Sequence, residues 1–71
     1  MNRIKQLRKE QNKTLREVAE AVGTSNQNIS NWERGKSEPK LSTWRKLMEY
    51  FGVSFEYLVG WTDERGKDEI R

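Results

Sequence analysis

Apolar residues recur along the chain at the three- and four-residue spacing that is typical of amphipathic helices. Polar residues separate them into five short blocks. The blocks are Ile4 and Leu7; Val18, Ala19 and Val22; Ile29 and Trp32; Leu41, Trp44, Leu47, Met48 and Phe51; and Phe55, Leu58 and Val59. No stretch alternates with the two-residue period of a strand. The pattern therefore predicts an all-α fold of five short helices around one small core.

Residues that favour helix termini lie between these blocks. Thr14 fits an N-cap, and Glu17 follows three residues later as in a capping box. Either Thr24 or Ser25 fits the N-cap of the third helix, and Ser54 fits that of the fifth. Helix ends and loops are predicted at Asn12, Gly23, Gly35, Pro39, Gly52 and Gly60. Apolar periodicity then stops, so we expect one domain over residues 1–60 and a flexible tail over 61–71.

The composition excludes several classes of chemistry. The 71 residues include no cysteine and no histidine, which excludes disulfides, thiolate chemistry and the usual zinc ligand sets. We expect no metal and no cofactor. No apolar run approaches the roughly 18–20 residues of a membrane span, and no convergent set of side chains indicates a catalytic site. These features favour a soluble, cytoplasmic protein that is not an enzyme.

The charge is unevenly distributed. The net charge is +3, and residues 1–60 carry 11 lysines and arginines against seven glutamates. A basic domain of this kind favours a polyanionic partner. The third predicted helix supports that direction, because it contains Asn26, Gln27, Asn28 and Asn31, and asparagine is a mediocre helix former. Its amides can donate and accept side by side, as the major-groove edge of adenine requires.

The segment "TLREVAEAVGTSNQNISNWERGK" resembles the helix-turn-helix of the lambdoid repressor/Cro family, often called XRE-like. The residues that carry the resemblance are Ala19, Gly23, Ile29, Trp32, Glu33 and Gly35, followed by Pro39, Leu41 and the segment "FGVSFEYLVG". The likeness covers roughly residues 3–60. It implies a lambda repressor-like DNA-binding domain whose third helix is the recognition helix.

The resemblance also implies roles for individual residues. Base-reading positions fall on Asn26, Gln27 and Asn31. Positions that contact the DNA backbone fall on Thr14, Asn28, Ser30, Arg34, Lys36 and Lys40. In the family an arginine of the first helix pairs with a glutamate of the recognition helix, which implies a structural salt bridge between Arg8 and Glu33.

Two positions depart from the family pattern. Lys13 stands where the family often has leucine, so no apolar residue precedes the Thr14 cap. Leu15 stands where many members carry a glutamine that contacts phosphate and supports the first base-reading amide. Leu15 can do neither, so it either packs against neighbouring apolar atoms or touches a thymine methyl group or a sugar edge.

The leading interpretation is a sequence-specific double-stranded DNA-binding protein that regulates transcription. The resemblance favours a phage- or mobile-element-type repressor that acts as a homodimer on a palindromic operator. Its dimer contact is expected in the fifth-helix region, at Phe55 and Tyr57, although at least one of these two residues is expected to pack in the core. Trp61 either folds back on the core or extends the dimer surface. The alternative is a protein-interaction module that reuses the fold, such as an antitoxin or a docking adaptor, with its function on Tyr57 and Trp61.

Overall fold

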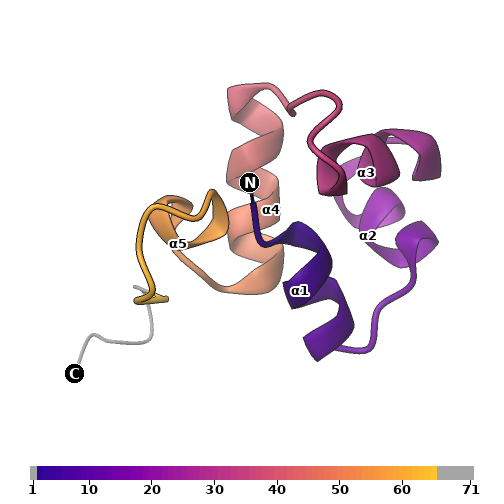
Figure 1. The fold of residues 1–71 in the computed structure, drawn as a ribbon. Coiled ribbons are helices and arrows are strands. Elements are labelled where there is room, and N and C mark those ends of the chain that lie inside the picture. The colour runs from indigo at the N-terminus through magenta and orange to yellow at the C-terminus, as the bar shows by residue number, and fades with distance from the viewer. Residues whose placement is uncertain (1, 66–71) are drawn as a thin grey trace.

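A computed structural model describes residues 2–65, and Figure 1 shows that this part of the chain is helical throughout its regular structure. The helices are α1 (Ile4–Glu10), α2 (Leu15–Val22), α3 (Asn26–Glu33), α4 (Leu41–Phe51) and α5 (Phe55–Leu58). No strand occurs among the described residues. The predicted all-α fold of five short helices is therefore confirmed.

The apolar blocks of the sequence meet in one core. Ile4, Leu7, Val18, Ile29 and Leu47 have no exposed surface. The rest of the core consists of Ala19, Val22, Trp32, Trp44, Phe51, Val53, Tyr57 and Leu58. Burying one large aliphatic side chain contributes roughly 1.5–3 kcal/mol, so a few such residues decide whether so small a domain folds.

The helices begin where the sequence predicts. The backbone N–H of Glu17 donates to Thr14 Oγ1 at 3.0 Å, and the Thr14 N–H donates to the Glu17 carboxylate at 2.8 Å, which completes the capping box. At α3 the cap is Ser25 rather than Thr24, because Ser25 Oγ accepts from the Asn28 N–H at 3.1 Å. Ser54 Oγ caps α5 in the same way, from the Tyr57 N–H.

The turn between α2 and α3 depends on Gly23. Its φ of +76° lies in the left-handed region, where a side chain is strained. The next N–H, of Thr24, donates back to the carbonyl of Ala19 at 2.9 Å. Ala19 itself is almost fully buried, and a small residue there lets α2 pack closely against α3.

Hydrogen bonds connect the segment after α5 to the residues just before α1 and α5. The Ser54 N–H donates to the carbonyl of Arg65 at 2.7 Å, and Arg3 binds the carbonyl of Thr62 and the carboxylate of Asp63. Residues 61–65 therefore lie along α5 and the start of α1. The rest of the predicted tail, residues 66–71, lies outside the described residues.

Of Phe55 and Tyr57, Tyr57 is the residue that packs in the core. Its side chain is buried in the core, and its hydroxyl accepts from the side-chain amide of Gln6 at 3.2 Å. Phe55 is half-buried and remains on the surface of the domain. Of the two residues predicted to touch a second copy, only Phe55 is accessible.

Candidate nucleic-acid interface

Helix α3 has one buried face and one polar, exposed face. Ile29 and Trp32 fix the buried face in the core, as the sequence predicts. Asn26, Gln27 and Asn28 are exposed. Ser30 and Asn31 are half-buried. The candidate base-reading residues therefore share one helix and remain available to a ligand.

The amides of Gln27 and Asn31 contact each other. Gln27 Nε2 donates to Asn31 Oδ1 at 3.1 Å, and an Arg34 Nη2 contact to the same oxygen measures 3.5 Å. Gln27 keeps its carbonyl oxygen and its second amide N–H for an external partner. One acceptor and one donor side by side are what an adenine base requires in the major groove.

Asn28 is exposed, but it also makes hydrogen bonds within the protein. Its Nδ2 donates to Thr24 Oγ1 at 2.8 Å, and its backbone N–H donates to Ser25. The side chain is thus oriented by the turn before α3. The exposed side chain lies in the first turn of that helix, where anions are favoured.

The N-terminus of α2 contributes Thr14. Its oxygen already accepts a hydrogen bond in the capping box, but the hydroxyl hydrogen is still available to a phosphate oxygen. The side chain is exposed, so the structural role and a DNA-binding role are compatible.

Three cations follow α3. Arg34, Lys36 and Lys40 are all exposed, and none of them belongs to a salt bridge within residues 2–65. Glu38 lies in the same loop. Unpaired cations beside a recognition helix are suited to phosphate contacts, which position a protein on DNA without reading its sequence.

A buried ion pair holds the C-terminal end of α3 on α1. Arg8 Nε donates to Glu33 Oε2 at 2.6 Å and Arg8 Nη2 donates to Glu33 Oε1 at 3.2 Å. The two side chains are 13% and 5% exposed. Asn2 adds a hydrogen bond from its Nδ2 to the Trp32 carbonyl at 2.9 Å, and the same carbonyl also accepts the Gly35 N–H at 3.2 Å. The predicted Arg8–Glu33 pair is present, whereas no sequence pattern pointed to Asn2.

Leu15 packs against the core and is half-buried, which agrees with the packing alternative. Lys13 has a structural contact of its own, because its carbonyl accepts from Arg8 Nη1 at 3.2 Å. The Arg8 guanidinium thus bridges α3 and the loop before α2.

The described residues contain neither a cluster of metal ligands nor a membrane-spanning helix. Among residues 2–65, no group of three or more His, Cys, Asp or Glu side chains is arranged to hold a metal ion. No helix in that range is long and apolar enough to cross a membrane.

A helix with a polar outer face, joined by a tight glycine turn to a preceding helix, defines a helix-turn-helix domain. A family model described as helix-turn-helix matches residues 4–58. The chain belongs to this family, of the XRE type, and its domain is a helix-turn-helix DNA-binding domain.

Named relatives agree with this assignment. The chain is 37% identical over 68 residues to the HTH-type transcriptional regulator ImmR of Bacillus subtilis (strain 168), and this covers 96% of the chain. It is 34% identical over 74 residues to the cryptic phage CTXphi transcriptional repressor RstR of Vibrio cholerae, covering 99% of the chain. The chain spans about half the length of ImmR (49%) and 67% of RstR. A further relative is MJ0272, an uncharacterized HTH-type transcriptional regulator of Methanocaldococcus jannaschii. It is 33% identical to the chain, and the matched region covers 96% of its length.

Proposed function

We propose that the protein binds specific double-stranded DNA sequences by inserting α3 into the major groove. The observation that carries the proposal is the amide-rich outer face of a helix whose other face is fixed by Ile29 and Trp32. Asn26, Gln27 and Asn31 read base edges in this proposal. Each bidentate contact between an amide and adenine would supply roughly 1–3 kcal/mol of discrimination.

The backbone contacts come from residues around α3 and the start of α2. They are Thr14, Asn28, Ser30, Arg34, Lys36 and Lys40. The three cations among them are exposed and outside the salt bridges of the described residues, which supports this role. Such contacts make affinity strongly dependent on salt.

The biological role that we infer is repression of transcription, of phage or mobile-element type, by a cytoplasmic protein without catalytic activity. The similarity to RstR, a cryptic phage transcriptional repressor, supports this role. We infer further that the protein acts as a homodimer on a palindromic operator. Two-fold pairing would place two copies of α3 on half-sites about 34 Å apart.

The test begins with selection of binding sites from a pool of random duplexes. The affinity for the selected duplex and for a scrambled duplex is then measured by fluorescence anisotropy at about 50 and 200 mM salt. We expect a clear preference for the selected duplex, which Gln27→Ala largely abolishes while its thermal unfolding stays like that of wild type. Failure to enrich any sequence, or a preference unchanged by Gln27→Ala, would contradict base reading by α3. That result would favour the protein-interaction module.

A further inference from the structure

The two residues before α1, Asn2 and Arg3, contact two different sides of the domain. Asn2 bonds to the C-terminal end of α3, and Arg3 bonds to α5 and to the segment that follows it. Figure 1 shows the start of α1 between α3 and α5. These two residues therefore connect the candidate recognition helix with α5.

The side-chain amide of Asn2 joins α1 to α3. Its Oδ1 accepts from the Ile4 N–H at 3.0 Å, which satisfies one of the free donors at the start of α1. Its Nδ2 donates to the Trp32 carbonyl at 2.9 Å. A single amide group carries both the acceptor and the donor, so it fixes the two helix ends relative to each other.

The guanidinium of Arg3 makes the contacts on the other side. It donates to the carbonyls of Tyr57 at 2.6 Å and Thr62 at 2.7 Å, and to the Asp63 carboxylate at 3.0 Å. The backbone N–H of Arg3 also donates to the Leu58 carbonyl at 2.8 Å. The Asp63 side chain is fully exposed, whereas the Arg3 side chain is only 19% exposed. The two carbonyl contacts of the guanidinium are therefore the better shielded from water.

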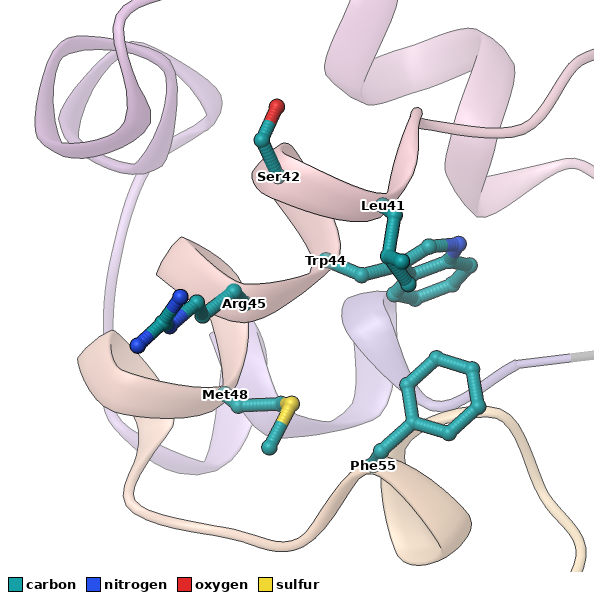
Figure 2. A pocket seen from close by; sticks show the side chains of 6 residues that line it. All are labelled: Leu41, Ser42, Trp44, Arg45, Met48 and Phe55. Atoms are coloured by element: carbon teal, nitrogen blue, oxygen red, sulfur yellow. The ribbon is translucent and has the colours of Figure 1, made fainter.

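The helix that Arg3 contacts is itself fixed on α4. Phe55, at the start of α5, meets Trp44 of α4 edge to face, with the ring centres 5.7 Å apart. Figure 2 shows these two rings at the edge of a hollow between the helices. Trp61 meets the same Phe55 ring at 5.6 Å, also edge to face. Helix α5 and residues 61–65 therefore form a firm support for Arg3.

Asn2 fixes the main chain at the end of α3. The Arg8–Glu33 pair reaches this end through two side chains, whereas Asn2 binds the Trp32 carbonyl of the helix itself. Two of the cations proposed to contact the DNA backbone lie within residues 34–36, directly after α3. A shift of this end would displace both these cations and the amides of α3 relative to DNA.

We propose that Asn2 and Arg3 are positioning residues for DNA binding, because together they hold the end of α3 in a fixed place relative to α5. The inference rests on the proposed DNA binding by α3 and deepens it. Neither residue touches DNA in this proposal. Asn2 acts by its direct contact with α3, and Arg3 acts by fixing the position of Asn2.

The first experiment removes one of the two contacts of Asn2. In Asn2→Ser the hydroxyl oxygen can still accept from the Ile4 N–H, but the side chain is too short to reach the Trp32 carbonyl. We expect the affinity for the selected duplex to fall about fivefold. The slope of log affinity against log salt should not change, since no phosphate contact is lost. Fluorescence anisotropy at several salt concentrations measures both quantities. Wild-type affinity would overturn the proposal, and so would a reduced slope, which would mean that Asn2 itself contacts a phosphate.

Gln11→Ser is the matched control. Like Asn2, Gln11 donates from its side-chain amide to a main-chain carbonyl at a helix end, here that of Phe51 at 3.3 Å. This bond joins the end of α1 to α4 and does not involve α3. Gln11→Ser should lose a similar amount of stability in urea denaturation but should bind the selected duplex like wild type. An equal loss of affinity in Gln11→Ser and Asn2→Ser would show that affinity follows stability alone and would overturn the positioning role.

The role of Arg3 is tested with its charge kept. Lysine at this position retains the charge but cannot present the planar set of donors that the two carbonyls require. Arg3→Lys should therefore weaken binding to the selected duplex, and in an Asn2→Ser background it should add little, because both changes act on the same contact with α3. Wild-type affinity of Arg3→Lys, or full additivity of the two losses, would overturn the part of the proposal that concerns Arg3.

The position of α3 can also be followed without DNA. The backbone N–H groups of residues 35 and 36 donate to carbonyls in the last turn of α3. Their hydrogen exchange should be about fivefold faster in Asn2→Ser than in wild type, and unchanged in Gln11→Ser. Unchanged exchange in Asn2→Ser, with sequence selection by the wild type intact, would contradict the positioning role alone. Faster exchange in Asn2→Ser with a wild type that selects no sequence would contradict the proposed DNA binding, and the contact would then serve the fold alone.

Discussion

The guanidinium of Arg8 meets the carboxylate of Glu33 through two hydrogen bonds, of 2.6 and 3.2 Å, and so joins α1 to the end of α3. Both side chains are almost shielded from solvent. Removing one partner leaves the other charge buried and unpaired, which costs roughly 3–5 kcal/mol. We therefore expect Arg8→Met to lower the free energy of unfolding by about that amount, measured by urea denaturation.

An exposed ion pair of the same protein is the control for this prediction. Arg16 pairs with Glu20 at 3.2 Å, but both side chains are largely exposed. Arg16→Met should change stability by less than about 1 kcal/mol. A double variant, Arg8→Met with Glu33→Leu, should recover part of the loss because no charge remains buried. Equal stability of Arg8→Met and wild type would show that the pair contributes nothing.

The sequence predicts those parts of the fold that depend on local signals. The capping box at Thr14 and Glu17 involves residues three positions apart, and the glycine turn at Gly23 is equally local. The Arg8–Glu33 pair joins residues 25 positions apart, and it was predicted from family resemblance rather than from periodicity. The base-reading and backbone-contacting roles come from the same resemblance and stay predictions.

The contacts between Arg3 and the segment after α5 could not be predicted from the sequence. Arg3 binds acceptors that lie 54 to 60 positions away, two of which are backbone carbonyls that no side-chain pattern encodes. The sequence places at least one of Phe55 and Tyr57 in the core but does not tell which of them it is. In a helix of only four residues the apolar period cannot separate a core aromatic from an exposed one.

Variants of Thr14, the N-cap of α2, can separate its contribution to stability from its contribution to DNA binding. Thr14→Ala removes the acceptor for the Glu17 N–H and should lower the free energy of unfolding by about 1 kcal/mol. Thr14→Ser keeps the hydroxyl and should retain both stability and affinity. Urea denaturation and anisotropy on the same three proteins would check this. Wild-type affinity of folded Thr14→Ala would exclude a phosphate contact from this side chain.

The contact between Gln27 and Asn31 predicts coupled base reading. Because Gln27 Nε2 donates to Asn31 Oδ1 at 3.1 Å, Asn31→Ala should also disturb the base that Gln27 reads. The losses of discrimination in Gln27→Ala and Asn31→Ala should therefore be less than additive in the double variant. Asn26, which makes no side-chain hydrogen bond to Gln27 in the described structure, supplies the control cycle. Additive losses in both cycles would show that Asn31 does not orient Gln27.

The exposed lysines after α3 predict a change in salt dependence. If Lys36 contacts a phosphate, Lys36→Gln should reduce the slope of log affinity against log salt by about 0.9. Lys46→Gln, on the exposed surface of α4, is the control and should leave the slope unchanged. Anisotropy titrations at several salt concentrations measure both slopes. Equal slopes for Lys36→Gln and wild type would remove Lys36 from the interface.

Residues 61–65 should be held less firmly in acid, because the Glu10 carboxylate pairs with Arg65. The hydrogen bond from Arg65, and then that from Gln6, lower the pKa of Glu10 below its ordinary value of 4.5. The carboxylate therefore contributes stability above pH 4.5 that is lost as the pH falls through the lowered pKa of the folded state. Glu10→Gln should be less stable than wild type at neutral pH, and the difference in urea denaturation should shrink as the pH falls. Glu56→Gln, whose carboxylate is in no salt bridge within residues 2–65, is the control. A difference between Glu10→Gln and wild type that is constant with pH would mean that the ionised carboxylate does not hold residues 61–65 in place.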